Sequence, residues 1–287
     1  MEIIIGKTAG FCFGVANAVN KTIKELKRVD ELYCLGELVH NKQVNKELED
    51  KGLNIIEDTK DAKKNIIIRS HGATQKTYED IDKMKLNVID LTCPKVLKIH
   101  DIVKEYSKNG YYIILIGKST HPEIVATTSY CGVSSKVIES EEQVKDVIQD
   151  LYNSNINKTL IIVQTTFSLE KFNNIVMEIR KEIAKKENIT IEIKNTICDA
   201  TKSRQDETRE ISSKVDMMIL IGGKHSSNTN KLYDISKEKC NNCFLIENAM
   251  ELDIGEIKKY NRIGIMAGAS TPKKSIDDVV EMLKKIC

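Results

Sequence analysis

Short apolar runs rich in isoleucine and valine recur along this chain, and each run ends in a turn of small and polar residues. Near-continuous runs of this kind are typical of strands that are buried on both faces of a parallel sheet. Amphipathic helical patterns follow the turns, and the alternation of strand and helix predicts a parallel α/β architecture. Five of the runs end at Ile68, Ile116, Val163, Ile221 and Met266.

The spacing of these five run ends predicts the number of lobes. Successive ends lie 48, 47, 58 and 45 residues apart, and two strand–helix units per lobe would give three lobes. We therefore expect three similar parallel-sheet α/β lobes around a shared centre. The first covers residues 1–93 and is closed by the C-terminal segment, the second covers 94–194, and the third covers 195–287 with a C-terminal helix. One large doubly wound sheet is the alternative.

Three cysteines occur in matching settings, each after an apolar β-branched run and before a helical pattern. They are Cys12, Cys93 and Cys198. We expect each thiol at the turn between the carboxyl end of a strand and the start of a helix. Ligands bind at such turns in open α/β sheets, and a helix N-terminus favours the thiolate. Three such thiolates, with no fourth in a matching context, predict a metal centre with one open coordination position.

The remaining cysteines fit simpler interpretations. Eight cysteines in a cytosolic chain favour metal binding or redox chemistry over a disulfide framework. Cys34 and Cys131 fit small buried hydrophobic residues, and the terminal Cys287 is predicted to be incidental. Cys240 and Cys243 form a C-x-x-C pair, but no second pair accompanies them, so an ordinary turn is the favoured interpretation.

The polar turns predict a small anionic ligand. Four of the five histidines lie in or beside them, and glycine pairs there allow close approach of the backbone. Diphosphate is the natural candidate. No Walker A pattern, dinucleotide glycine fingerprint or dense Arg/Lys clamp is present, which favours a small diphosphate ester over a nucleotide. The alternative is helix capping, for which Ser226, Ser227 and Asn228 are each suitable, but repetition at equivalent strand ends favours the ligand.

Charge and hydropathy exclude several classes of partner. The 44 basic and 42 acidic residues nearly balance at a net charge of +2, so no nucleic-acid or membrane surface is expected. The N-terminus lacks the pattern of a signal peptide, and no run approaches the roughly 18 apolar residues of a membrane helix. The sequence predicts a soluble, cytoplasmic protein.

Taken together, the turn motifs resemble the 4-hydroxy-3-methylbut-2-enyl diphosphate reductase family, whose enzyme is the last of the methylerythritol phosphate route to isoprenoids. The resemblance implies a three-lobed α/β fold around a central 4Fe–4S cluster. The motifs span residues 9 to 270 in family order. They are Ala9-Gly10-Phe11-Cys12, Val39-His40-Asn41, Ser70-His71-Gly72, Thr92-Cys93-Pro94, His121-Pro122-Glu123, Gln164-Thr165-Thr166, Thr196 to Thr201, Ser226-Ser227-Asn228 and Ala267 to Ser270.

The resemblance also implies a role for each matching residue. Cys12, Cys93 and Cys198 match the three cluster ligands, and the fourth iron, which lacks a protein ligand, binds the substrate hydroxyl in that family. Glu123 matches the essential acid, and Thr165 matches the hydroxyl residue near the substrate alcohol. The residues that match the surroundings of the diphosphate are His40, His71, His121, Ser226, Ser227, Asn228 and Ser270.

The implied reaction is a two-electron reductive dehydroxylation that gives isopentenyl and dimethylallyl diphosphates, with ferredoxin or flavodoxin as electron donor. We expect a monomer. Asn17 stands where family members commonly carry a basic residue, and the chain lacks the longer tail of some relatives. Two other functions stay open. An iron–sulfur electron carrier would be expected to use four cysteines, and a small-molecule binding protein would leave the three matched cysteines unexplained.

Overall fold

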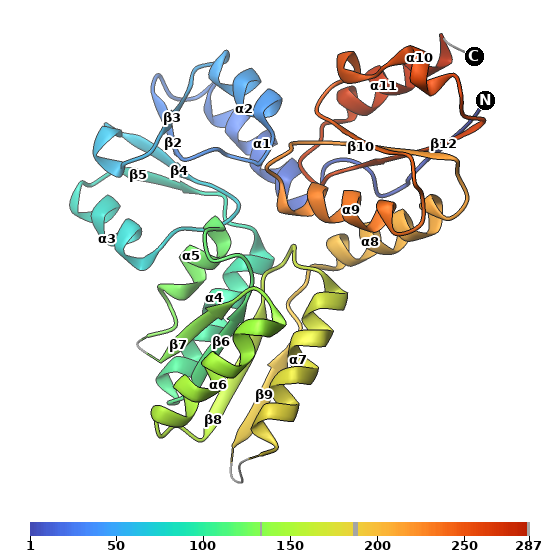
Figure 1. The fold of residues 1–287 in the computed structure, drawn as a ribbon. Helices are drawn as coiled ribbons and strands as arrows, with labels where there is room; N and C mark the ends of the chain where they lie inside the picture. Colours follow the sequence, from blue (N-terminus) through green and yellow to red (C-terminus); the bar gives the residue numbers. More distant parts are fainter. Residues whose placement is uncertain (133, 186–188, 286–287) are drawn as a thin grey trace. The chain divides into compact units, whose positions relative to one another are not determined.

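The computed structural model describes residues 1–132, 134–185 and 189–285, and Cys287 lies outside them. Its strands form three four-stranded sheets with parallel pairing, flanked by helices (Figure 1). The predicted α/β class is confirmed, and one large doubly wound sheet is excluded. The strands predicted to end at Ile68, Ile116, Val163 and Ile221 end at those residues.

The described residues pack as two compact units. Unit 1 comprises Met1–Leu32, Gly36–Ile55 and Asp199–Cys287, and unit 2 comprises Tyr33–Leu35 and Ile56–Cys198.

The first sheet lies in unit 1 and has the strand order β1-β12-β10-β11. Residues of β10 are buried on both faces, because Ile219 packs with the side chains of α11 while Leu220 packs with those of α8 and α9. The strands are β1 (Glu2–Ile5), β10 (Met217–Ile221), β11 (Cys243–Ile246) and β12 (Arg262–Ala267). The helices are α1 (Phe13–Glu25), α8 (Asp199–Ser212), α9 (Ser227–Lys237), α10 (Ile254–Ile257) and α11 (Lys273–Lys284), with the 3₁₀ turn η3 (Ala249–Glu251).

The second sheet has the order β3-β2-β4-β5. Its core includes Ile66 and Ile68, which pack with Ile81. The strands are β2 (Leu32–Leu35), β3 (Leu53–Ile56), β4 (Asn65–Ile68) and β5 (Asn87–Asp90). The helices are α2 (Lys42–Glu49) and α3 (Gln75–Lys83), with the 3₁₀ turn η1 (Thr59–Asp61).

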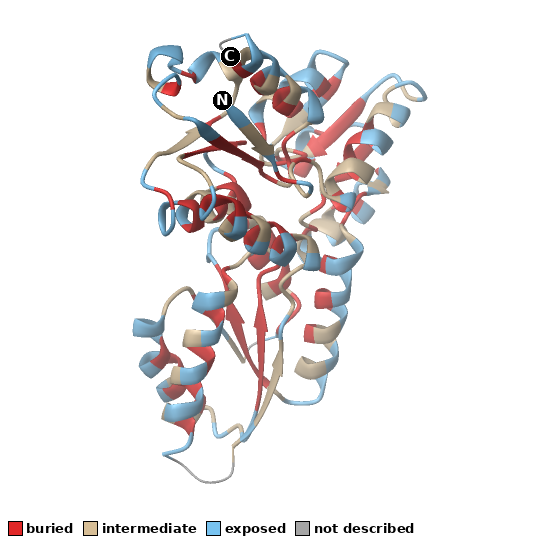
Figure 2. Ribbon diagram, turned by 90° about the vertical axis from the view of Figure 1, so that its right-hand side faces the viewer, coloured by how far each residue is buried: buried red, intermediate tan, exposed pale blue. Residues whose placement is uncertain are grey.

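The third sheet lies in unit 2 and has the order β7-β6-β8-β9. Ile114 packs in the core that α6 and α7 cover, and Ile113 packs in the core that α4 covers. The central strand β6 is therefore buried on both faces, and buried strands run through the middle of this sheet in Figure 2. The strands are β6 (Tyr112–Ile116), β7 (Ser135–Ile138), β8 (Lys158–Val163) and β9 (Thr190–Lys194). The helices are α4 (Pro94–Lys108), α5 (Pro122–Thr128), α6 (Val144–Asn153) and α7 (Leu169–Ile183), with the 3₁₀ turn η2 (Glu141–Gln143).

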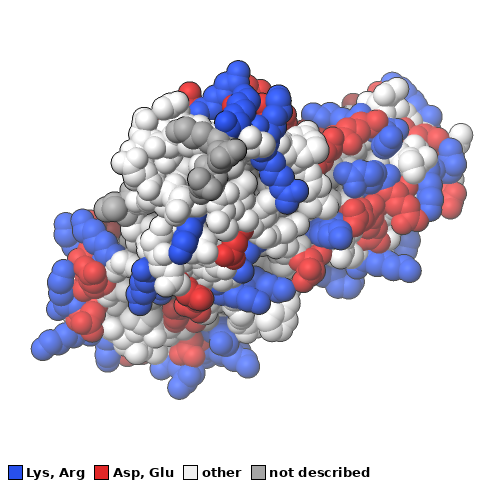
Figure 3. Space-filling view, turned by 90° about the horizontal axis from the view of Figure 1, so that it is seen from below, with Lys and Arg blue, Asp and Glu red and all other residues white. Residues whose placement is uncertain are grey.

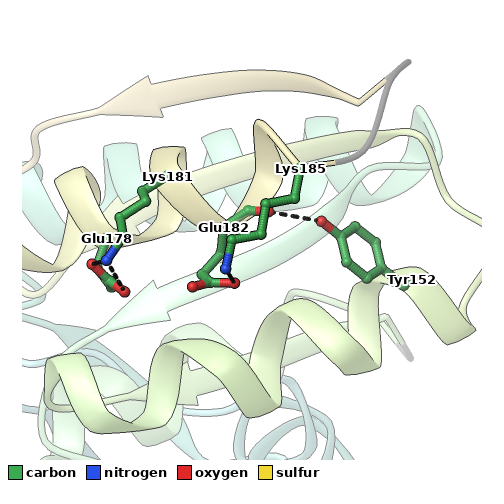
Figure 4. Close-up of polar contacts among 5 residues, drawn as sticks. All are labelled: Tyr152, Glu178, Lys181, Glu182 and Lys185. Carbon is green, nitrogen blue, oxygen red and sulfur yellow. Dashed lines mark hydrogen bonds and ion pairs between the residues drawn. The ribbon is translucent and has the colours of Figure 1, made fainter.

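Polar contacts supplement the apolar packing between α6 and α7. The Tyr152 hydroxyl on α6 donates to the carbonyl oxygen of Glu182 on α7 at 3.0 Å (Figure 4). On the outer side of α7, Lys181 pairs with Glu178 at 3.1 Å, and both side chains remain in contact with water. Exposed pairs of this kind contribute little to stability, so the apolar core holds these helices together.

The sheets group the chain differently from the predicted first lobe. β1 pairs with β12, with Glu2 opposite Arg262 and Ile5 opposite Ile265, so the start of the chain belongs to the sheet of β10–β12. Strands β2 to β5 form a sheet without β1. The local pattern predicts a strand at residues 2–5 but carries no information about its partner, because the pairing joins segments about 260 residues apart.

The surface agrees with the balanced charge. On the face shown in Figure 3, basic and acidic side chains lie interspersed, so that face carries no large area of a single sign. Among the described residues, no helix combines the length and apolar character needed to cross a membrane.

Candidate functional site

Cys12 lies in unit 1, in the loop that joins β1 to α1. It occupies the N-cap position of α1, but its side chain does not cap the helix. Its backbone N–H donates to the carbonyl oxygen of Ala269, in the turn after β12, at 3.0 Å. Gly10 has a φ of +102°, a conformation that side chains disfavour. Cys12 therefore lies between the carboxyl end of β1 and the start of α1, as predicted, and the adjacent parallel strand β12 ends beside it.

Cys93 and Cys198 have equivalent positions in unit 2. The N–H of Cys93, just before α4, donates to the carbonyl oxygen of Ser70 at 3.0 Å, and Ser70 follows β4. The N–H of Cys198 donates to the carbonyl oxygen of Thr165 at 3.0 Å, and Thr165 follows β8. All three thiols are half-buried. The predicted strand–helix setting of the three cysteines is thus observed in each case.

The chemistry of these thiols fits a soft metal centre. Thiolates are the ligands that iron–sulfur clusters use, and half-buried sulfurs at helix starts are accessible to a metal. Burial raises the pKa of Cys34 to about 12, which only the neighbouring Arg69 opposes, and it raises that of Cys131 to about 12. Those two thiols are fully enclosed, so they behave as the small hydrophobic residues predicted from the sequence.

Glu123 lies at the start of α5 and is 2% exposed. The Thr165 N–H donates to its Oε1 at 2.7 Å, and the Thr165 hydroxyl lies 2.5 Å from its Oε2. Burial raises the pKa of Glu123, and the two hydrogen bonds from Thr165 oppose this only in part. Because the Thr165 carbonyl also accepts from Cys198, one residue connects a buried acid to the backbone of a candidate ligand.

Two histidines lie near this acid in unit 2. His121 caps α5, where its Nδ1 accepts from the Glu123 N–H at 3.2 Å. In the neutral ring the proton must then be on Nε2, which makes Nε2 a hydrogen-bond donor. The His71 ring meets the His121 ring edge-on, with centroids 5.5 Å apart. His71 lies in the turn after β4, where Gly72 has a φ of +78°.

Unit 1 gathers the other predicted ligand-binding turns. Ser226 caps α9, since its Oγ accepts from the Thr229 N–H at 3.3 Å, so the capping interpretation holds for this residue. The Ser270 hydroxyl donates to the carbonyl oxygen of His40 at 3.1 Å. A Cβ on Gly223 would lie 2.6 Å from the same His40 oxygen, so only glycine fits beside it. Ser227 is half-exposed at the start of α9.

Asn228 differs from its neighbours on α9. It is 4% exposed, yet neither Oδ1 nor Nδ2 has a hydrogen-bond partner among the described residues. A buried amide without a partner costs free energy unless another group supplies one. Asn228 does not cap the helix, which Ser226 does. The Asn228 side-chain amide, which can both donate and accept, therefore lies at the N-terminus of an eleven-residue helix. Anions bind at such helix starts.

Two residues that contact the Cys12 loop were not identified by the sequence analysis. Arg204 and Glu207 on α8 make hydrogen bonds to the loop that carries Cys12. Helix α8 is polar, and the sequence pattern is typical of a solvated surface helix, but five of its polar residues are buried. These are Thr201, Arg204, Gln205, Thr208 and Ser212. Their spacing along one helical face, directly after Cys198, is the signal that could have identified them.

Comparisons with known proteins agree with this arrangement. The family model described as "LytB protein" matches residues 3–284. A protein from Alkaliphilus oremlandii is 38% identical over 290 residues, covering all of both chains, and one from Clostridioides difficile is 40% identical over 289 residues, also covering all of both chains. Both are named 4-hydroxy-3-methylbut-2-enyl diphosphate reductase.

Solved structures are similar as well. The E-1-hydroxy-2-methyl-but-2-enyl-4-diphosphate reductase from Plasmodium falciparum superposes with a TM-score of 0.89 at 30% identity, over 99% of this chain and 88% of that one. A second structure is described as (E)-4-hydroxy-3-methyl-but-2-enyl diphosphate reductase, the terminal enzyme of the non-mevalonate pathway. It gives a TM-score of 0.71 at 36% identity, over 99% of this chain and 100% of that one.

Proposed function

Since the chain belongs to the LytB protein family, we propose that it removes the hydroxyl group of 4-hydroxy-3-methylbut-2-enyl diphosphate by reduction. The enzyme is an oxidoreductase of the non-mevalonate isoprenoid pathway. The substrate takes up two electrons and two protons, loses its hydroxyl as water, and leaves as isopentenyl or dimethylallyl diphosphate.

The cofactor of this reaction is a 4Fe–4S cluster held by Cys12, Cys93 and Cys198. Bound there, the cluster supplies the electrons and one iron without a protein ligand. The half-buried, strand-end position of all three thiols supports this assignment. Cys34, Cys131 and Cys240 are buried, which argues against them as ligands.

The hydrogen-bond chain from Glu123 through Thr165 is the observation that carries the proposed mechanism. Hydroxide is a poor leaving group, so the departing oxygen needs a proton. Burial raises the pKa of Glu123, which keeps the acid protonated to a higher pH than an exposed glutamate. The Thr165 hydroxyl, 2.5 Å from the carboxyl, is placed to pass that proton on.

The diphosphate group is held by polar side chains and by the start of α9. The buried amide of Asn228 gains the hydrogen-bond partner that it lacks, and the first backbone N–H groups of α9 favour a negative charge. Ser226 and Ser227 add hydroxyl donors, and the Ser270 hydroxyl adds another when it turns from the His40 carbonyl oxygen to the phosphate. His40, His71 and His121 add imidazole donors. The Nε2 proton that the capping bond assigns to His121 suits a phosphate oxygen.

The electron donor is a small redox protein such as ferredoxin or flavodoxin, because a reductase of this kind needs an external reductant. A monomeric state and a cytoplasmic location stay predictions from the sequence.

The test is anaerobic reconstitution of the protein with iron and sulfide. We expect a brown protein whose absorption spectrum changes when the allylic diphosphate is added, and turnover with a chemical reductant. A coloured protein whose spectrum is indifferent to this diphosphate would instead favour an electron carrier. A colourless protein that still binds the diphosphate would favour a simple binding protein.

A further inference from the structure

The loop that presents Cys12 is bound to helix α8 by a set of hydrogen bonds between residues almost 200 positions apart. Oε1 of Glu207 accepts from the Lys7 N–H at 2.7 Å, and Oε2 accepts from the Thr8 N–H at 2.8 Å and from the Thr8 hydroxyl at 2.5 Å. One turn earlier on α8, Arg204 donates from Nη2 to the carbonyl oxygen of Gly10 at 2.7 Å. All of these residues belong to unit 1.

The chemistry of the Glu207 contact requires a carboxylate. All three partners donate, and an ionised carboxylate accepts on both oxygens with no proton of its own in the way. Burial acts to raise the pKa of Glu207, but the hydrogen bonds from Thr8 and Lys7 outweigh it and hold the pKa below its ordinary value. In glutamine, one of the two acceptor oxygens becomes an NH₂ donor, which would face a donor N–H of the loop.

Arg204 is unusual for a charged residue because only 5% of it is exposed. Its Nη1 donates to the Ala200 carbonyl oxygen on its own helix at 2.8 Å, while Nη2 reaches the loop. The planar fork of the guanidinium spans both acceptors, which a lysine ammonium on a single flexible stem cannot do as well. Gly10, the acceptor in the loop, lies two residues before Cys12.

The loop is also fixed at its other end. The Cys12 N–H bonds to Ala269, and a Cβ on Gly6 would lie 2.0 Å from the sulfur of Met266. Between these points Ala9 packs against the apolar core, and its N–H donates to the carbonyl oxygen of Gly6 at 3.2 Å. Lys7 is exposed and Thr8 is polar, so the polar contacts that hold these two residues and Gly10 to α8 are those of Glu207 and Arg204.

We propose that Arg204 and Glu207 are positioning residues for Cys12, which hold the Lys7–Cys12 loop against α8 so that its thiolate is presented to the cluster in a fixed place. This inference rests on the proposed function, in which Cys12 is a cluster ligand. Residues that orient a metal ligand typically change metal affinity by about 10- to 100-fold when they are replaced.

The test compares Glu207→Gln and Arg204→Gln with Asp206→Asn and Arg209→Gln. The control residues lie on the same helix and pair with each other at 3.5 Å on its solvent side. Hydrogen exchange of the Lys7 and Thr8 amides is measured before and after reconstitution, iron release to a chelator is measured after it, and thermal unfolding is followed for every protein.

We expect faster amide exchange at Lys7 and Thr8 in Glu207→Gln and about tenfold faster iron release in both test variants, at the low end of the range for such residues. The controls should match the wild type. If Glu207→Gln does not fold, Thr8→Ala removes only the hydroxyl contact and should still release iron faster than Asp206→Asn.

Two results would overturn the inference, and they can be told apart. Wild-type protein that takes up no iron overturns the proposed function and this inference with it. Wild-type protein that takes up iron, while the test variants retain it as well as the controls do, overturns the inference alone.

Discussion

Glu123 is the residue whose surroundings most restrict its role. It is enclosed, its pKa is raised by burial, and both carboxyl oxygens contact Thr165. A glutamine here can reproduce both contacts, because its oxygen accepts from the Thr165 N–H and its NH₂ donates to the Thr165 hydroxyl. Replacement by glutamine therefore removes the proton and leaves the geometry.

We predict that Glu123→Gln lowers turnover by at least about 100-fold, the usual loss for a missing general acid. Cluster content and substrate binding should stay near normal, because neither depends on the proton. Steady-state rates and iron content measured on the same preparation check this. Near-normal turnover would mean that Glu123 merely starts α5, where a carboxylate favours the helix dipole.

The same variant has a testable effect on stability. The folded state holds the Glu123 proton up to a higher pH than the unfolded state, whose carboxyl has a pKa of about 4.3. Between these two pKa values the folded state binds more protons, so wild-type stability falls as pH rises. The glutamine of Glu123→Gln does not titrate. In iron-free protein, the thermal midpoint of the variant minus that of the wild type should therefore increase as pH rises above about 4.3. A difference independent of pH would contradict the raised pKa.

Asn228 tests the diphosphate assignment. Its amide is buried and lacks a partner among the described residues, so an anionic ligand would satisfy it. We predict that Asn228→Ala raises KM and also lowers kcat, since the diphosphate is held in both the ground and transition states. The loss of one charge-assisted hydrogen bond costs about 2 kcal/mol. Unchanged substrate affinity would show that Ser226, Ser227 and Asn228 only form the start of α9.

At the scale of elements, the helices owe their positions to apolar faces with a few polar contacts between them. The Tyr152 hydroxyl is the polar contact between α6 and α7 that Figure 4 shows. We predict that Tyr152→Phe lowers the free energy of unfolding by about 1 kcal/mol, the typical value of one hydrogen bond. Lys181→Ala, which breaks only the exposed pair with Glu178, should change it by less than about 0.5 kcal/mol. Chemical denaturation of both variants decides.

The amino-acid composition of helix α8 gives a wrong indication of which of its residues are buried. Its composition indicates a surface helix, but Arg204, Thr208 and Ser212 are buried, and each donates to a backbone carbonyl oxygen. Buried polar groups are tolerated when their hydrogen bonds are made. Periodicity of apolar residues cannot identify such a face, since the face is polar.

At the scale of the whole molecule, the cluster assignment needs residues 12, 93 and 198 together. We predict that Cys12→Ser, Cys93→Ser and Cys198→Ser each abolish the intact cluster or nearly all turnover. The cluster has only three protein ligands in this assignment, so the loss of any one of them leaves too few to hold it. Cys243→Ser, in the C-x-x-C pair, is the control and should leave iron content unchanged. Burial and the neighbouring Cys240 raise the pKa of Cys243 to about 12, so it stays a protonated thiol. Iron analysis after reconstitution checks all four variants. Loss of iron in Cys243→Ser with iron retained in Cys93→Ser would mean that the wrong cysteines were assigned.

The sequence by itself determined the local features of this protein. Strand ends such as Ile116 and Val163, the strand–helix setting of Cys93 and the polar turn at Ser226 all follow from residues within a few positions of each other. Apolar runs, helical periodicity and turn composition act over that range, so they can be read from the chain without a fold.

Only the tertiary structure decided the features that join distant segments. β1 pairs with β12, so the start of the chain lies in the sheet of β10–β12 and not in the sheet of the predicted first lobe. Hydrogen bonds of Arg204 and Glu207 join the Cys12 loop to α8. The physical reason is that any parallel strand offers the same backbone groups to any neighbour. A hydrogen bond between residues 200 positions apart, such as Lys7 and Glu207, likewise exists only once the fold has brought them together.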